Sequence, residues 1–504
     1  MTELKQNKLF SVYTAYFCLL TVYMAVREVL PLNFLIESTV VSGVIFAMAL
    51  VLILIDLFTE QNCLKGRMSD LLIFFLIVCV VSSLINFKYG VFGNLKIIAA
   101  LAIEFLLLFP FSKGKEEDQK EKLLNAVSVT LIVIWGVFTL FSLMMYFFSV
   151  DFLVRGLGSW GLVNQGFSNK YGRLWGIFQD PNYAGTVCII SIILSARLIL
   201  KYKKVLLSVL LAVNIIGQLF FIVLGGSRAS LIIISLCTAL AVLWKTVFSA
   251  RFQMKRLLCG VVLSAVSVAV IFGAFQLVKI SLPAVKAAAV SEQTAASVNG
   301  FFNKFYSVSS LDYFPADSQD DIGRDDPQHP GNDKNDITRT DLDNMSDISN
   351  GRFKRWKDTI KIFLKTPVFG TSPRNTSAFA KEHCPDTLMA KYGIVSHNGY
   401  LDVLVSTGII GFVILAAAVI LGLIKILPLF FSSASTAEIC QITVLLAAIA
   451  VSAFFVSDVF MTFSMGSFLF WLFFGMDISY GESKQKNGLF QTAFNKIFKR
   501  KRKV

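Results

Sequence analysis

Long apolar segments recur along most of the chain, and they constrain its fold more than any other feature. A helix needs roughly 20 predominantly apolar residues to cross the hydrocarbon core of a bilayer, and the hydropathy pattern predicts about twelve such spans. They lie near residues 10–26, 38–58, 70–87, 91–111, 123–149, 183–200, 205–224, 229–248, 257–278, 404–424, 439–459 and 463–480. The chain is 55% hydrophobic and only 16% charged, whereas soluble domains average about 25% charged residues. The sequence therefore predicts an all-α integral membrane protein, and it excludes a mostly disordered chain, a collagen and a disulfide-stapled secreted domain.

Positive charges between the spans predict how the chain is oriented. Clusters of Lys and Arg occur in alternate connections and at both ends: Lys5 and Lys8; Lys65 and Arg67; Lys113, Lys115, Lys120 and Lys122; Arg197, Lys201, Lys203 and Lys204; Arg251, Lys255 and Arg256; Lys425; and the run from Lys499 to Lys503. Short loops rich in Lys and Arg stay in the cytoplasm, so we expect both termini there. The net charge of +14 thus sets orientation and does not indicate a nucleic-acid partner. The basic tail is expected to contact anionic membrane lipid.

One connection on the opposite side is far longer than the others. We expect residues 1–278 to hold the first nine spans, 279–403 to form a large extracytoplasmic loop, 404–480 to hold the last three spans, and 481–504 to form the cytoplasmic tail. Within the loop, residues 311–348 are polar and Asp-rich. This composition favours a flexible solvated insertion over a calcium site, because the spacing matches no calcium loop. No Cys and His spacing indicates zinc, so neither a metal nor a cofactor is expected.

Arginines that face away from the cytoplasm are the first candidates for a binding site, because they run against the positive-inside pattern. Arg228 lies in GGSRAS, between two spans with almost no loop, within the turn 225–229. This places a fixed cation at the outer membrane boundary, beside glycines that let a ligand approach the backbone. The alternative is an arginine that only anchors a helix end.

A second candidate segment is the outer connection at 151–182. It ends with GRLWGIFQDPN, which contains Arg173 and Asn182. Asp180 and Pro181 in this motif predict a capped helix start. The free N–H groups and positive dipole end of such a helix attract anions, although an ordinary capped helix is the alternative.

His397 lies where the large loop re-enters the membrane. A histidine that titrates near neutrality is a suitable general base for a hydroxyl nucleophile, although a structural role is the alternative. Arginines, a helix N-terminus and a base together suit an anionic group at the outer membrane surface. Pyrophosphate esterified to a lipid fits, because Arg binds phosphate oxygens with two parallel hydrogen bonds. If that lipid carries a sugar, the arginines can stabilise the pyrophosphate leaving group without a metal.

Four motifs occur in a fixed order: GRLWGIFQDPN before a span, GGSRAS between two spans, NGRFKRW leading into KTPVFGTSP, and SHNGYLDVLVSTGIIG at re-entry. Their order and spacing resemble the O-antigen ligase and Wzy polysaccharide polymerase superfamily. The resemblance covers roughly residues 170–415 at the level of motifs. It implies a fold related to the lipid-dependent membrane glycosyltransferases (GT-C-like) and an inverting, metal-independent transfer. The Asp-rich insertion at 311–348 is not part of the family pattern.

The resemblance also implies roles for particular residues. Arg228 and Arg352 are expected to bind pyrophosphate, and His397 is expected to activate the acceptor hydroxyl. Four further residues are expected to line the site: Arg173, Asn182, Arg355 and Tyr400. The implied partners are a glycan on undecaprenyl pyrophosphate and a glycan acceptor, with a flippase and a chain-length regulator as further candidates. The implied location is the bacterial cytoplasmic membrane, with the active site on its extracytoplasmic face.

Three functions remain in competition. The leading interpretation is a polymerase that extends a cell-surface polysaccharide from lipid-linked repeat units. A ligase that moves the finished glycan to another acceptor shares the same donor site, so the motifs do not separate the two. A lipid-linked oligosaccharide flippase is the alternative from another class, but such a transporter should show internal repeats and charges near the bilayer midplane. The sequence shows no convincing repeat, and Glu104 is its one clear intramembrane acid.

Overall fold

The computed structural model describes nine segments of the chain: residues 2–37, 39–155, 162–168, 171–248, 253–308, 313–315, 351–432, 436–457 and 459–480. The expected tail at 481–504 and nearly all of the expected insertion at 311–348 lie outside them. The described chain is mostly helical and divides into two compact units. The first comprises Met1–Ser42, Asn125–Leu243 and Leu257–Asn350, and the second Gly43–Leu124, Trp244–Arg256 and Gly351–Val504.

Nine helices in the described part of the chain are long and apolar enough to cross a membrane. They are α1 (Thr2–Arg27), α3 (Thr39–Phe58), α4 (Arg67–Ile85), α6 (Glu117–Phe147), α7 (Pro181–Tyr202), α8 (Val205–Leu224), α9 (Arg228–Leu243, extended by the π-helix η5, Trp244–Phe248), α10 (Met254–Ala289) and α15 (Gly399–Phe430). The other three expected spans coincide with shorter helices: α5 (Phe92–Ile103) with the π-helix η3 (Glu104–Leu108), α16 (Ala437–Ser452) and α17 (Met465–Tyr480). The mostly helical membrane fold is thereby confirmed, while the number of spans stays a prediction.

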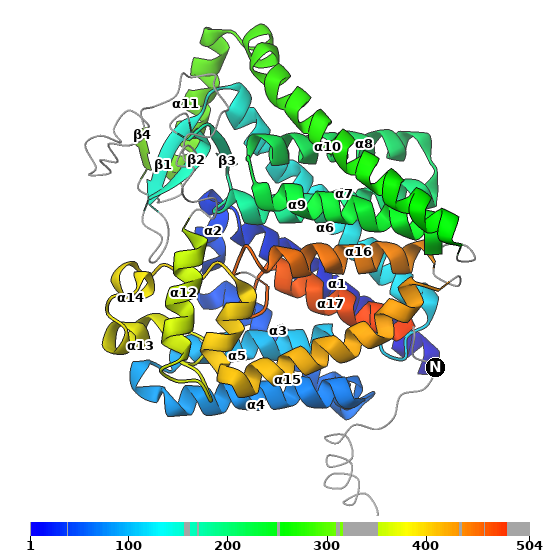
Figure 1. Cartoon of the computed structure of the whole chain (residues 1–504), viewed down its shortest axis with the longest axis vertical. Helices are drawn as coiled ribbons and strands as arrows, with labels where there is room; N and C mark the ends of the chain where they lie inside the picture. The colour runs from blue at the N-terminus through cyan, green and yellow to red at the C-terminus, as the bar shows by residue number, and fades with distance from the viewer. Residues whose placement is uncertain are drawn as a thin grey trace, which may run out of the picture. The chain divides into compact units, whose positions relative to one another are not determined.

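In the first unit, α7, α8 and α9 run side by side (Figure 1). Polar side chains link α6, α8 and α7 within this layer. Thr139 donates to Gln218 at 2.9 Å, Gln218 donates to Asn214 at 3.0 Å, and Asn214 donates to Ser195 at 3.0 Å. Hydrogen bonds of this kind hold membrane helices together, because lipid offers their polar groups no other partner.

A small antiparallel sheet, which the sequence pattern does not predict, also belongs to the first unit. Its order is β3-β2-β1-β4, with β1 at Asp151–Arg155, β2 at Leu162–Ser168, β3 at Arg173–Gly176 and β4 at Tyr313–Pro315. Phe152 on β1 pairs with Pro315 on β4, so the sheet joins two connections far apart in sequence. The helix α11 (Glu292–Val308) packs on it (Figure 1): the Tyr306 ring lies 4.3 Å from that of Phe152. These two connections of the first unit are therefore folded.

The second unit is built around α17, whose residues from Met465 to Ser479 are all buried. A helix that is apolar on every side is expected to be a central one. The Trp471 ring meets the Phe105 ring edge-on, with 4.8 Å between centroids. At Gly475 a side chain would overlap the backbone of Phe109, so glycine allows the two segments to touch.

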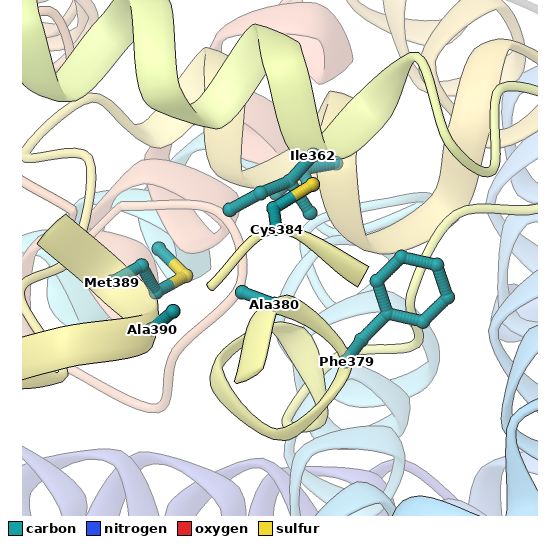
Figure 2. Packing of buried hydrophobic residues seen from close by; sticks show 7 residues of the cluster. Ile362, Phe379, Ala380, Cys384, Met389 and Ala390 are labelled. Atoms are coloured by element: carbon teal, nitrogen blue, oxygen red, sulfur yellow. The ribbon is translucent and has the colours of Figure 1, made fainter. Parts of the chain in front are cut away.

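Several short elements complete the second unit. The helix η1 (Asn62–Leu64) follows α3, and η2 (Phe87–Tyr89) precedes α5. Three further helices precede α15: α12 (Arg352–Phe363), α13 (Thr376–His383) and α14 (Leu388–Tyr392). The helix α2 itself (Leu30–Glu37) belongs to the first unit. The helices α12, α13 and α14 gather at one end of α15 (Figure 1). Their shared core consists of Ile362, Phe379, Ala380, Cys384, Met389, Ala390 and Val405 (Figure 2).

The helix α15 is broken at Gly408, where φ is 66° and ψ is −170°. The segment after α12 lies against this break. Thr371 N donates to Val405 O at 2.8 Å, and Ile409 N donates to Pro367 O at 2.8 Å. These bonds satisfy the backbone groups that the break releases, a requirement for irregular backbone in a membrane protein. The expected motifs KTPVFGTSP and STGIIG therefore meet backbone to backbone.

Candidate active site

Arg173 lies at the start of β3, and only 7% of it is exposed. Its Nε donates to the carbonyl of Gly225 at 2.6 Å, and its Nη2 donates to Oδ1 of Asn182 at 2.7 Å. The guanidinium also lies 5.6 Å from the centroid of the Trp175 ring. A guanidinium can bridge such acceptors because its donors form a rigid fork. Arg173 thus fixes the turn before α9 to the start of α7.

The start of α7 has the cap that the sequence predicts. Asp180 is the N-cap, its Oδ1 accepts a hydrogen bond from Asn182 N at 2.7 Å, and Pro181 occupies the first turn. The helix α9 begins beside it, because Gly185 on α7 leaves room for Ser230 on α9. Two helix N-termini therefore lie close together within the first unit. Their free N–H groups and dipoles favour an anion.

Arg228 is the first residue of α9, and its side chain is half-buried. Within the described residues, the structure gives this side chain no hydrogen-bond or ion-pair partner. The turn before it contains Gly226 at φ 56°, a conformation that favours glycine. A half-buried guanidinium at a helix N-terminus has unused capacity for a bidentate anion such as phosphate.

Arg352 begins α12 in the second unit, after Gly351 in the left-handed conformation. Its guanidinium lies 5.4 Å from the centroid of the Phe455 ring. Arg355, one turn further on, is half-buried. Stacking of a guanidinium on an aromatic ring is a favourable contact that restricts how the guanidinium is oriented. The Phe455 ring therefore helps to orient Arg352, as Gly225 and Asn182 help to orient Arg173.

His397 is half-buried, and its backbone has φ 51°. Non-glycine residues rarely adopt this conformation, which concentrates at functional sites. Both neighbours are fixed. Ser396 Oγ donates to Asp402 Oδ1 at 2.6 Å, and Asn398 caps α15 by accepting from Tyr400 N at 3.0 Å. The strained backbone is thus held from both sides.

The segment that follows α16, residues 453–456, supports both His397 and Arg352. Gly399 N, two residues after His397, donates to Ala453 O at 2.7 Å and to Val456 O at 3.1 Å. Phe455 of the same segment carries the Arg352 guanidinium. The two expected site residues therefore rest on one short segment within the second unit.

Tyr400 has its own contacts with this support. Its hydroxyl donates to Ala450 O at 2.8 Å, and its ring lies 4.5 Å from that of Phe454. Tyr400 therefore fixes the start of α15 to the end of α16.

The other histidines have different surroundings. His383 packs on Phe379 with 4.3 Å between ring centroids, and its Nε2 lies 2.8 Å from the hydroxyl of Tyr89. Glu382, the residue before His383, accepts a hydrogen bond from Lys88. This bond holds the pKa of the Glu382 carboxyl below its ordinary value. His329 lies outside the described residues. Of the two described histidines, His397 alone has backbone in the left-handed region.

The arginines and His397 are predicted from the sequence as site residues, but the contacts that hold them are not. The clamp from Arg173 to Gly225 and the support at 453–456 are contacts between segments far apart in sequence. No local sequence pattern predicts these contacts, because residues 453–456 (AFFV) have the composition of the apolar end of a span. Among the described residues, no group of three or more His, Cys, Asp or Glu side chains could hold a metal ion.

Comparison with protein families found a match that covers part of both units. The model of the family described as O-antigen ligase matches residues 209–416. The matched stretch contains Arg228, Arg352 and His397, while Arg173 and Asn182 precede it. A comparison with curated proteins found no match.

Proposed function

We propose that this chain, which belongs to the O-antigen ligase and Wzy polymerase superfamily, polymerises lipid-linked oligosaccharide repeat units into a cell-surface polysaccharide. The family match supports glycan transfer of the O-antigen ligase or polymerase type, with a lipid-linked glycan substrate and an acceptor. The nine apolar helices agree with a multi-pass membrane enzyme. The proposal adds that the donor is a glycan on undecaprenyl pyrophosphate and that the reaction takes place on the extracytoplasmic face of the bacterial cytoplasmic membrane.

Arg228 is the observation that carries the proposal. Its guanidinium is half-buried and has no partner among the described residues. It stands beside two helix N-termini and follows a turn that Arg173 fixes through Gly225 O. An unpaired, partly desolvated cation is costly in the absence of an anion. A pyrophosphate would supply the missing acceptor oxygens.

In the proposed reaction, His397 takes the proton from an acceptor hydroxyl. The hydroxyl oxygen attacks C1 of the donor sugar, and the bond from C1 to the pyrophosphate oxygen breaks. The leaving lipid pyrophosphate takes the electron pair, and the sugar configuration inverts. Arg228 and Arg352 are proposed to stabilise the charge that develops on the leaving group, a contribution that does not require a metal.

A ligase is the closest competing function, because it shares the donor chemistry. Among the described residues, no segment has the character of a dedicated acceptor domain. We take this to favour the polymerase over the ligase. A flippase would need no general base. The backbone of His397, which hydrogen bonds of its neighbours fix in a strained conformation, therefore favours a transferase over a transporter.

The experiment uses the purified full chain with one substrate, an undecaprenyl-pyrophosphate-linked repeat unit. A polymerase produces a ladder of longer lipid-linked glycans, because donor and acceptor are then the same compound. If no ladder forms until a different acceptor is added, the chain is a ligase. If the lipid-linked unit only changes leaflet in proteoliposomes, both transferase hypotheses are wrong.

A further inference from the structure

We propose that α12 is an interfacial helix that binds the anionic headgroup layer of the membrane. The proposal rests on the outer face of this helix and is independent of the reaction proposed above. Phe353, Ile360 and Leu364 occur at spacings of seven and four residues, so they fall on one face of the helix. Their exposures are 67%, 44% and 66%. Val368, which lies beyond the end of the helix, is 49% exposed. The outer face therefore carries a continuous apolar stripe.

Lysines follow one border of this stripe. Lys354, Lys357 and Lys361 are all exposed, and their positions lie 40° to 100° around the helix from Phe353 at about 100° per residue. Lys361 is paired with Asp386 at 2.6 Å, so Lys354 and Lys357 are the two lysines proposed to meet the headgroups. The sequence RFKRWKDTIKIF contains five cationic residues and one acidic residue. Arg352 and Arg355 fall on the other side of the helix. The lysines are thus separate from the proposed pyrophosphate ligands.

The inner face of α12 is anchored, so the stripe is not available to the core. Ile362 is fully buried among Cys384, Met389 and Val405 (Figure 2). Asp358 accepts a hydrogen bond from Leu388 N at 2.8 Å. These contacts fix the rotation of the helix and present Phe353 and Leu364 outward.

The position of the break in α15 indicates the depth of α12 relative to the membrane boundary. The part of α15 after Gly408, residues 409–430, rises about 33 Å at about 1.5 Å per residue, which is enough to cross a hydrocarbon core of roughly 30 Å. A membrane boundary therefore lies near Gly408. Pro367 bonds to Ile409 at this level, and α12 ends four residues before Pro367. The stripe thus lies at the height of the headgroups.

This combination of features fits a lipid surface better than water or the hydrocarbon core. A helix exposed to water does not usually keep a row of large apolar side chains, and a spanning helix rarely carries five cations. A basic helix with one apolar face lies in the interface, with its apolar side among the upper acyl chains and its lysines near anionic headgroups. Docking of α12 would hold Arg352 at the level where a lipid-linked pyrophosphate also lies.

The test uses the full chain in nanodiscs, with the photoreactive residue benzoylphenylalanine at position 353. The same residue at position 364 is a second variant, in case the first does not fold. Position 381, exposed on α13, is the control. In discs that contain phosphatidylglycerol, we expect lipid adducts at 353 and 364, measured by intact mass, and none at 381.

The contribution of charge is tested in the same discs. We expect the adduct yield at 353 to fall several-fold when phosphatidylcholine replaces phosphatidylglycerol, or when Lys354→Gln and Lys357→Gln are combined. A protein adduct at 353, to a second copy or to a co-purified chain, would overturn the proposal. So would equal lipid adducts at 353 and 381, or a yield that depends neither on lipid charge nor on the two lysines.

Discussion

The two units hold their candidate residues by different physical means. In the first unit, Arg228 follows a turn that is fixed by hydrogen bonds from the buried guanidinium of Arg173. In the second, Arg352 and His397 rest on the segment 453–456, through an aromatic ring and through backbone hydrogen bonds. The first arrangement depends on side chains that can be changed one at a time. The second depends on backbone geometry, so a single change there should disturb several groups together.

The largest effect is expected from Gly408→Ala, which tests the backbone side of this comparison. Gly408 has a positive φ, and a Cβ there would overlap the carbonyl of Val368. Strain and overlap should cost roughly 3–5 kcal/mol of stability. Thermal unfolding in detergent measures the loss. Gly43→Ala is the control, because nothing lies within 4 Å of its Cβ position; equal stability of the two variants would refute the role of the break.

His397→Asn separates the chemistry of His397 from its backbone strain. Asn tolerates the left-handed conformation, so the protein should fold, while the loss of a general base lowers rates by about 10²–10⁴-fold. The rate of glycan extension and the melting temperature are measured together. His383→Asn is the matched control and should keep most of its activity. Near-normal extension by His397→Asn would remove the general base from the mechanism.

Arg228→Lys tests the side-chain arrangement of the first unit. Lysine retains the positive charge but lacks the planar fork that binds two phosphate oxygens. We expect a loss of about 10²-fold in kcat, comparable to the removal of one oxyanion donor. The exposed Arg67→Lys on α4 provides the control. If both variants extend glycans at the wild-type rate, Arg228 is only a helix anchor.

Arg173→Lys should have the smallest effect and sharpens the distinction between a ligand and a positioning residue. The variant loses one of the two contacts that join Gly225 to Asn182, each worth about 1–3 kcal/mol for a charged donor. We expect a rise of about tenfold in KM for the lipid-linked donor, with the pH profile of kcat unchanged. A shifted pH profile would mean that Arg173 acts in the chemical step instead.

The sequence predicted most of the helices and one of the caps. Apolar runs of spanning length identify α1, α4 and α15 because bilayer thickness imposes their length. The Asp180 cap is equally local, since Asp followed by Pro is a strong signal of a helix start. These features depend on neighbours in sequence, and the structure confirms them.

Features made by distant contacts were not predictable in the same way. The pairing of Phe152 with Pro315 joins segments more than 150 residues apart, and no pattern near either residue selects the other. Arg173 was expected to line the site, but whether a guanidinium faces a ligand or a carbonyl depends on where Gly225 lies. The short α17 was expected as a span from its apolar composition, which does not distinguish contact with lipid from burial in protein.

The most direct measurement of the central claim is the binding of undecaprenyl pyrophosphate to the purified full chain in detergent. We expect saturable binding by the wild-type protein and binding weakened by at least about tenfold in Arg228→Lys, since the bidentate contact is lost. Arg67→Lys should bind as the wild type does. Equal affinity in the wild type and Arg228→Lys would contradict the claim that the half-buried guanidinium of Arg228 is the pyrophosphate ligand.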